Sequence, residues 1–357
     1  MESRVSLLLL TIVVPFSGFV WSKILGFGIS PVPTWLNYGQ VVLSSWILII
    51  PIIAVTHLYR LAIDGPAHPL VAFIKILFTQ MMNRDWFLRL VILVVLALLL
   101  GSFTVFKSII PRIQPFVYDY EFMIIDRLIF FGQDPWRVTH ALFGDALSTW
   151  VLQQFYIYWF ALMWFSLAFV TLRSDLRRLR ARYLLAFSLS FIVIGSFSAL
   201  ILSSAGPCYF GWATGGPDVY EPLMSRLRDL DAALRSMSPP LELNALLLQD
   251  YLKAAHDKGE IVFGGGISAM PSMHVAVAAL VALAAWSYQR WLGILLAPFV
   301  LIIWIGSIHL GWHYAIDGPV ALLLTMVIWW LSGIIVSSLG IVDNLGGEPG
   351  GSRWSTL

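Results

Sequence analysis

Two short polar patches carry the residue types that acid–base and nucleophilic chemistry need. They are residues 270–274, with the sequence MPSMH, and residues 313–317, with the sequence HYAID. Each patch borders an apolar stretch long enough to form a membrane helix, so the two histidines should share one face of the bilayer if these helices are neighbours. Two imidazoles in that position can act together on a phosphate at a membrane surface.

The first patch predicts a helix N-terminus that favours an anion. Pro271 and Ser272 precede an apolar run, so Ser272 is the expected N-cap and the first backbone N–H groups of the helix are free to bind substrate. His274 then falls in the first turn. From there its imidazole can give a proton to a leaving oxygen.

The second patch pairs a histidine with an acid. His313 and Asp317 are four residues apart, or one helical turn, so the carboxylate can hold one ring nitrogen while the other acts as a nucleophile. This chemistry needs positioning and charge stabilisation, and we predict neither a metal nor another cofactor. An alternative is a metal-binding stripe of His309, His313 and Asp317, although no cysteine or further acid joins it.

The chain as a whole is too apolar for a water-soluble protein. Hydrophobic residues make up 59% of it, charged residues 12%, and the mean hydropathy is +0.82. We therefore predict an all-α fold, a polytopic integral membrane helix bundle of about eight transmembrane helices. The expected spans are residues 5–22, 39–57, 87–106, 149–172, 183–203, 272–288, 292–311 and 318–338.

Arginines between two spans predict the orientation. Residues 173–182 contain five arginines, and such loops face the cytoplasm. Counting spans from this loop places both polar patches on the extracytoplasmic face. The first apolar stretch could instead be a signal peptide, but no typical cleavage site follows it. The net charge of +2 gives no sign of a nucleic-acid partner.

The organisation that follows has six parts. Transmembrane helices fill residues 1–106, and residues 107–148 form an interfacial or re-entrant outer segment. A transmembrane pair with the arginine-rich loop (149–203) precedes a helical extracytoplasmic insert (204–271). The catalytic transmembrane helices (272–340) and a C-terminal tail (341–357) complete the chain. Within the outer segment, Asp119 and Asp126 either bind a polar head group or pair with Arg112 and Arg127.

The two patches resemble the second and third signature motifs of the type 2 phosphatidic acid phosphatase superfamily. The amino-acid sequence of the two patches is most similar to the motifs of the branch that contains the inositol phosphorylceramide synthases, which are inositolphosphotransferase-like enzymes. The resemblance is most specific over residues 264–320. It implies that His313 becomes a phosphohistidine, that Asp317 orients it and that His274 protonates the leaving group.

The chain departs from the phosphatase pattern where that pattern has arginines. Lys107 with Pro111-Arg112 is only a partial substitute for the first motif, and residues 306–308 (GSI) replace the Ser-Arg that opens the third. The phosphate charge must then be met by Lys107, Arg112, His309 or the helix terminus at Ser272. The missing arginines favour the transferase branch.

Three functions compete. The first is a lipid phosphotransferase that moves a head-group phosphate from a phospholipid to an alcohol acceptor, either a second lipid or a polyol. The second is a phosphatase for a lipid phosphate or an isoprenoid diphosphate, with water as acceptor. The third is a lipid transporter or scramblase that uses the histidines as a proton relay. A transporter would place charged groups near the middle of the membrane, whereas these patches lie at the ends of apolar stretches.

Overall fold

The computed structural model describes residues 2–341 apart from 66–67, 69, 76–83 and 174–175. These residues form helices and connecting loops, with no strand among them. The long helices are α1 (Glu2–Leu25), α2 (Val32–Asp64), α4 (Arg84–Ile113), α7 (Ala146–Leu172), α8 (Arg177–Leu189), α13 (Met273–Tyr288), α14 (Arg290–His309) and α15 (Asp317–Ser338). The predicted all-α class is confirmed for this part of the chain.

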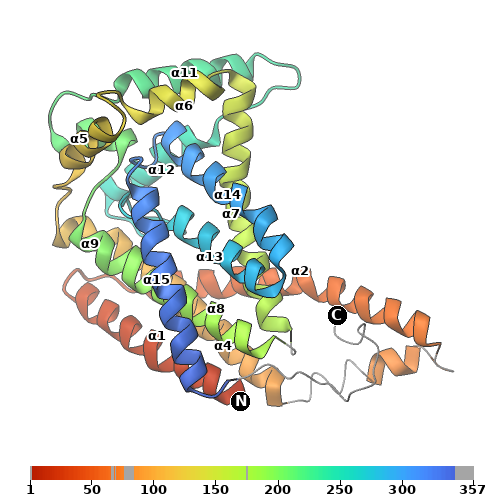
Figure 1. Ribbon diagram of the computed structural model, residues 1–357. Helices are drawn as coiled ribbons and strands as arrows, with labels where there is room; N and C mark the ends of the chain where they lie inside the picture. The colour runs from red at the N-terminus through yellow and green to blue at the C-terminus, as the bar shows by residue number, and fades with distance from the viewer. Residues whose placement is uncertain (1, 66–67, 69, 76–83, 174–175, 342–357) are drawn as a thin grey trace.

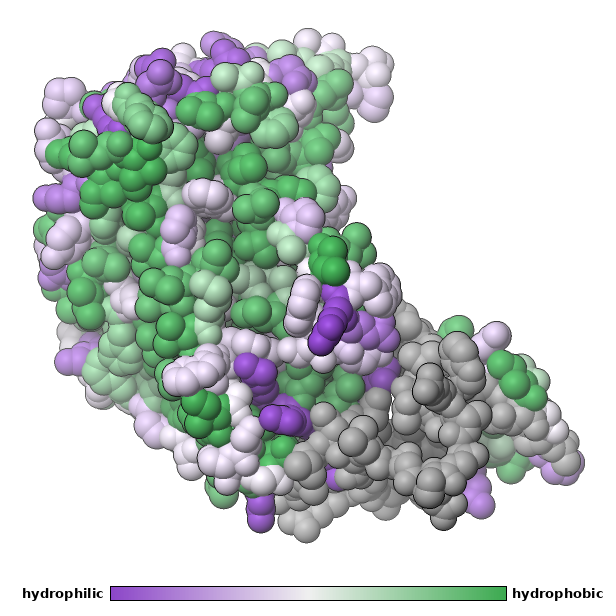
Figure 2. Space-filling model, viewed as in Figure 1, coloured by the Kyte–Doolittle hydropathy of each residue, from purple (hydrophilic) through white to green (hydrophobic). Residues whose placement is uncertain are grey.

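Six helical segments are long and apolar enough to cross a membrane. They are Arg4–Leu25, Phe87–Ile113, Ala146–Leu172, Arg177–Ile201, Arg290–His309 and Asp317–Ser338. Each contains or closely matches one of the predicted spans. Figure 2 shows hydrophobic residues over much of the height of the bundle, as a surface facing hydrocarbon requires. The protein is thus an integral membrane protein.

The other two predicted spans have a different character. Residues 39–57 belong to α2, where many side chains lie outside the described residues, and this stretch is not among the six. Residues 272–288 correspond to α13, which has only 16 residues. At 1.5 Å per residue α13 measures about 24 Å, less than the roughly 30 Å of a hydrocarbon core.

Short helices gather at one end of the bundle (Figure 1). The predicted outer segment contains α5 (Asp119–Ile129) and α6 (Pro135–Phe143). The predicted insert contains α11 (Glu221–Arg235) and α12 (Asn244–Lys258), together with the short η2 (Pro207–Tyr209) and α10 (Phe210–Thr214). The two helices expected in the insert are confirmed. Gln153 of α7 ties the insert to the bundle by accepting from Ala245 N–H at 2.9 Å and donating to the Glu242 carbonyl at 3.1 Å.

Arginines gather at the opposite end. Arg4 donates to the Leu339 carbonyl at 2.7 Å, Arg178 donates to Ser337 Oγ at 3.1 Å, and both acceptors lie at the end of α15. Arg180 is fully buried and donates to the Arg173 carbonyl at 2.7 Å beyond the end of α7. Part of the arginine-rich loop therefore caps a helix terminus in addition to carrying surface charge.

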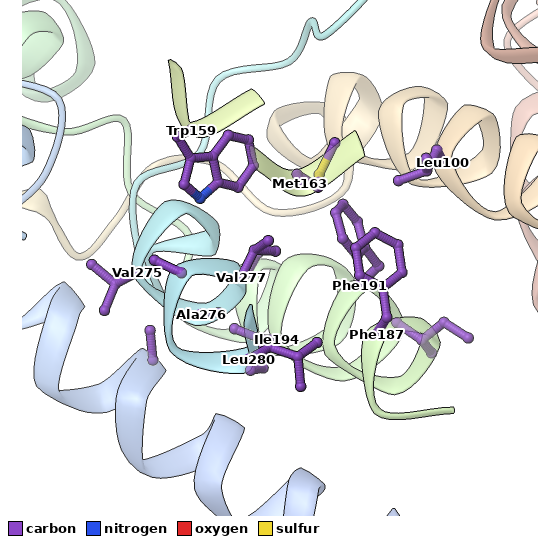
Figure 3. Packing of buried hydrophobic residues seen from close by; sticks show 14 of the residues in the cluster. Leu100, Trp159, Met163, Phe187, Phe191, Ile194, Val275, Ala276, Val277 and Leu280 are labelled. Carbon is purple, nitrogen blue, oxygen red and sulfur yellow. The ribbon is translucent and has the colours of Figure 1, made fainter. Parts of the chain in front are cut away.

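Helix α13 lies inside the bundle. Eight of its residues are buried, and Figure 3 shows Val275, Val277 and Leu280 packed among side chains of neighbouring helices, with Trp159 of α7 over its first turns. After α8 the chain continues as the π-helical segment η1 (Ser190–Ser198) and the short α9 (Ala199–Ile201). A π-helical segment in a span often accompanies a functional site.

Candidate active site

The His313–Asp317 pair forms where α14 ends and α15 begins. His313 Nδ1 and Asp317 Oδ2 are 3.0 Å apart, and both side chains are buried. The predicted contact is confirmed, but it does not arise from a turn of one helix. His313 lies in the loop between the helices and Asp317 is the first residue of α15. With Nδ1 donating to the carboxylate, Nε2 keeps its lone pair.

His274 enters the site from the first turn of α13. Ser272 is the N-cap, and its side chain accepts the Val275 N–H, as predicted. The imidazole rings of His274 and His313 have centroids 5.9 Å apart. The predicted convergence of the two histidines on one place is therefore confirmed.

Both histidines line one cavity of about 390 Å³. Its wall is mostly apolar and is drawn from several helices, with Leu100 and Phe103 from α4, Met163 from α7 and Phe191 from η1. Polar groups converge at one part of the wall, as in a pocket that binds an amphipathic ligand. An apolar tail can pack against the greater part of this lining while a phosphate meets the histidines.

Lys107 lines the same cavity. It comes from the last turns of α4, and Gly266 packs against its backbone, since a Cβ on Gly266 would lie 2.8 Å from the Lys107 carbonyl carbon. Gly266 has a φ of +87°, which only glycine adopts easily. Thus Gly266 is needed for this close approach, and the structure brings Lys107 together with the two histidines.

Arg112 lies elsewhere. It lines a smaller cavity of about 110 Å³ beside Glu260 and His256. Its guanidinium is 3.5 Å from the Gly259 carbonyl oxygen and lies over the Phe27 ring. Of the groups expected to meet the phosphate charge, Arg112 therefore lies apart from the two histidines, whereas Lys107 lines their cavity.

His309 also points away from the catalytic cavity. Its ring stacks on His140 with centroids 3.8 Å apart, and its Nε2 is 2.9 Å from Thr149 Oγ1. His140 Nε2 donates to the His309 carbonyl at 2.9 Å. Because the predicted metal stripe needs His309 and His313 on one helical face, the end of α14 at His309 removes that arrangement.

The two aspartates of α5 hold backbone rather than cations. Asp119 accepts N–H groups from Ala205 and Gly206 at 2.8–3.0 Å, together with the Tyr314 hydroxyl at 2.7 Å. Asp126 accepts the N–H groups of residues 315 and 316 at 2.6 and 2.9 Å. The prediction that they pair with Arg112 and Arg127 is therefore wrong. Arg127 instead pairs with Asp134.

These contacts explain how the loop that carries His313 is held. The Asp126 carboxylate fixes the backbone on its C-terminal side, and Asp119 holds the Tyr314 hydroxyl. The Ser307 carbonyl accepts the N–H groups of Trp312 and His313 at 2.9 and 3.2 Å. The Cys208 N–H donates to the Gly311 carbonyl at 2.9 Å. The sequence gives a signal for α5, since Asp119 and Asp126 are seven residues apart and so share one helical face.

Electrostatics at the dyad favours a neutral nucleophile. Burial, reinforced by the nearby Lys107 ammonium, lowers the pKa of His313 to about 3. A ring with this pKa is uncharged near neutral pH, so its Nε2 lone pair is available for attack on an electrophile. In the part of the chain that the structure describes, no group of three or more His, Cys, Asp and Glu residues is arranged to hold a metal ion.

The model of the PAP2 superfamily matches residues 120–331, more than half of the chain. The chain belongs to the PAP2 superfamily. It is therefore a membrane enzyme of the phosphatase or phosphotransferase type that acts on lipid phosphates. The matched region contains both histidine patches. Neither the curated proteins nor the solved structures contain a match to the chain.

Proposed function

We propose that the enzyme is a lipid phosphotransferase that works through a phosphohistidine on His313. The observation that carries the proposal is the meeting of His313, Asp317 and His274 in one cavity with Lys107. His313 Nε2 attacks phosphorus, and the bond from phosphorus to the leaving oxygen breaks. That oxygen takes a proton from the His274 imidazolium, while Asp317 holds the attacking ring in place.

The phosphoryl oxygens are bound by Lys107 and by the start of α13. The N–H groups of Met273 and His274 have no acceptor within their own helix, and a helix N-terminus favours negative charge. Lys107 is the one Lys or Arg among the described residues that line this cavity. One lysine and a helix terminus then take the place of an arginine clamp. Ser272 contributes as the N-cap of α13, because it holds the helix terminus that binds the phosphate. Neither Arg112 nor His309 is part of the proposed binding site.

Head-group transfer of the inositol phosphorylceramide synthase type is the reaction we favour. In its second step the hydroxyl of an alcohol acceptor, a lipid or a polyol, gives its proton to His274 and attacks the phosphohistidine. The support is the helical insert, since Leu248 and Tyr251 of α12 contribute to the cavity wall. A mostly apolar pocket can retain an acceptor lipid and limit the access of water. With water as acceptor the same steps amount to phosphatase activity.

We further propose that the chain crosses the membrane eight times with the site on the extracytoplasmic face. Two contacts of α2 support its crossing antiparallel to α4, because Trp35 bonds to Ser102 while Val42 packs near Leu93. Helix α13 begins at Met273, one residue before His274, and its last residue, Tyr288, packs on Phe169 near the other end of the bundle. The arginines gathered at that other end support its placement in the cytoplasm.

The test is a product analysis with purified protein in lipid. Labelled phosphatidic acid, phosphatidylinositol and other phospholipids are supplied with and without diacylglycerol, ceramide and inositol, and the products are identified by mass spectrometry. Transfer predicts a new head-grouped lipid that appears only when an acceptor is present. Inorganic phosphate as the sole product would select the phosphatase reaction instead.

The covalent intermediate is tested with the same lipids. Rapid quenching should trap label on wild-type protein, and His313→Ala should carry none while keeping the thermal stability of the wild type. Turnover without label at His313, or full turnover by His313→Ala, would overturn the proposed mechanism. Loss of activity in EDTA with recovery in zinc would show that a metal is required.

A further inference from the structure

Helix α7 presents three aromatic side chains to the proposed acid. The rings of Tyr156 and Trp159 have centroids 4.3 and 4.5 Å from the centroid of His274, and the ring of Phe160 lies 6.4 Å away at 83°. The three positions follow the i, i+3, i+4 pattern of one helical face. Figure 3 shows Trp159 directly over the start of α13. Helix α7 therefore forms a wall against the imidazole.

The two nearest rings restrict His274 in different ways. Tyr156 is nearly parallel to the imidazole, at 23°, and covers its face. Trp159 is tilted by 45°, and its indole Nε1–H also donates to the His274 carbonyl at 2.8 Å. Trp159 thus binds both the ring and the main chain of the same residue. A buried aromatic ring with such contacts has few alternative positions, so it limits the rotation of the imidazole.

The packing of these aromatic rings restrains the His274 imidazole without hydrogen bonds to its ring nitrogens. Among the described residues, no side-chain hydrogen bond to a His274 ring nitrogen is found, whereas His313 has Asp317. The imidazolium must still point at the leaving oxygen during the first step. Faces of Tyr and Trp also attract a cation, which offsets part of the cost that burial imposes on a charged imidazole. The aromatic wall can therefore supply what the carboxylate supplies for the nucleophile.

We propose that Tyr156 and Trp159 are positioning residues that hold His274 for proton donation to the leaving group. This inference rests on the proposed function, because it requires His274 to act as the acid. It adds that α7, outside both histidine patches, determines how well the enzyme expels a poor leaving group. The positioning role concerns the breaking of the phosphorus–oxygen bond rather than the attack by His313.

The experiment compares two leaving groups in one lipid. The first compound is the dioctanoyl lipid that labels His313 in the wild type, either phosphatidic acid or phosphatidylinositol. The second is its analogue in which sulfur replaces the oxygen between phosphorus and diacylglycerol. A thiolate leaves without protonation, whereas an alkoxide needs the acid. Single-turnover rates of phosphoenzyme formation report the first step alone for both compounds.

We expect Tyr156→Leu and Trp159→Leu to slow phosphoenzyme formation from the oxygen ester by about 10- to 100-fold, since general acid catalysis is typically worth about 100-fold or more. The same variants should slow phosphoenzyme formation from the sulfur analogue by less than about threefold, because its leaving group needs no acid. His274→Ala should show the same selectivity with a larger loss. Tyr156→Phe keeps the ring and should retain the wild-type ratio of the two rates. Tyr158→Leu, on the exposed side of α7, is the matched control and should change neither rate.

Equal losses on both compounds would overturn the inference and assign the rings a purely structural role. Wild-type rates in both leucine variants would overturn it as well. Failure of the proposed function has a different signature, because wild-type protein would then form no phosphohistidine with either lipid. Thermal stability measured beside the rates identifies a variant that has lost its fold, and Trp159→Phe then replaces Trp159→Leu. It keeps one aromatic ring, but it removes the Nε1–H donor and part of the indole, and it should show the same selectivity with a smaller loss.

Discussion

Asp126 accepts the main-chain N–H of Ala315 at 2.6 Å, two residues after His313. The same carboxylate binds the N–H of Ile316 at 2.9 Å, so one side chain of α5 fixes two consecutive peptide groups beside the nucleophile. This contact joins the segment before α7 to the loop before α15. It makes α5 part of the support of the active site.

Removing this carboxylate should impair catalysis more than a change at the surface. Asp126→Ala leaves two backbone donors without their acceptor, at a cost of about 1–3 kcal/mol for each buried group. The loop is then free to shift, and a displacement of about 1 Å at a reacting group can cost about 100-fold in rate. We expect a loss of at least about tenfold in the rate of phosphoenzyme formation, with a lower melting temperature.

The control for Asp126→Ala is Asp229→Ala on the exposed face of α11. Both variants lose one carboxylate, but only the first should affect rate and stability. Unchanged activity in Asp126→Ala would show that the loop keeps its position without α5. Asp119 provides a second check, because its carboxylate holds the Tyr314 hydroxyl and residues 205–206.

Replacing Lys107 with alanine should lower kcat/KM far more than replacing Arg112. Lys107 lines the cavity with both histidines, whereas Arg112 lines the smaller cavity near Gly259. A hydrogen bond to a charged group is worth about 1.5–3 kcal/mol, so Lys107→Ala should lower kcat/KM by roughly 10- to 100-fold. Arg112→Ala should change it by less than about threefold. Steady-state kinetics of both variants on the same lipid test this difference. A larger loss in Arg112→Ala than in Lys107→Ala would place the phosphate in the smaller cavity instead.

Local spacing was sufficient to predict the dyad. The N-cap at Ser272 places His274 in the first turn of α13, and the separation of His313 from Asp317 permits their contact whether or not one helix carries both. Hydropathy likewise predicts the long spans, because hydrocarbon requires continuous apolar helices. These features depend on residues close together in the chain.

The sequence did not predict where His309 and Arg112 lie, because their positions depend on contacts between segments far apart in the chain. Periodicity put His309 on the same stripe as His313, but α14 ends at His309 and its ring packs on His140, 169 residues earlier in the chain. Arg112 is five residues from Lys107, so the two lie on different faces of α4. The aromatic wall of Tyr156 and Trp159 has no distinct sequence signal, since aromatic residues occur throughout α7.

The outer face of α5 should lie in lipid. Leu128 is 74% exposed and Phe131, two residues past the end of α5, is 97% exposed, while Asp119 and Asp126 on the inner face are buried. Figure 2 shows hydrophobic residues at the place that α5 occupies in Figure 1. A helix whose exposed face is mostly apolar, with Glu121 as its exposed acid, fits a membrane interface rather than water. This prediction retains the interfacial segment expected for residues 107–148.

A fluorescent label can test the placement of α5. Cys208 is the only cysteine, so Cys208→Ala gives a background in which Phe131→Cys or Leu128→Cys carries a single nitrobenzoxadiazole group. Spin-labelled phospholipid should quench both labels strongly, and iodide in the buffer should quench them weakly. A label at Asp229→Cys on α11 should show the opposite pattern. Strong iodide quenching at position 131 would place α5 in water.

The contact between α6 and α11 should make the helices above the site sensitive to acid. Arg226 Nε–H donates to His140 Nδ1 at 3.0 Å, which requires a neutral imidazole. Burial lowers the pKa of His140 to about 4, whereas the ordinary value is 6.5. The unfolded state therefore takes up the proton first as the pH falls. The contribution of His140 to stability is complete above about pH 6.5 and is lost between about pH 6.5 and pH 4.

Melting temperatures measured from pH 8 to pH 4.5 test this relationship. The wild type should lose stability over the lower part of the range, and His140→Gln should show a shallower decline because glutamine does not titrate. His68→Gln is the matched control, because it removes an exposed imidazole, and it should keep the wild-type slope. If His140→Gln kept the full wild-type slope, the acid sensitivity would have to come from a group other than the His140–Arg226 contact.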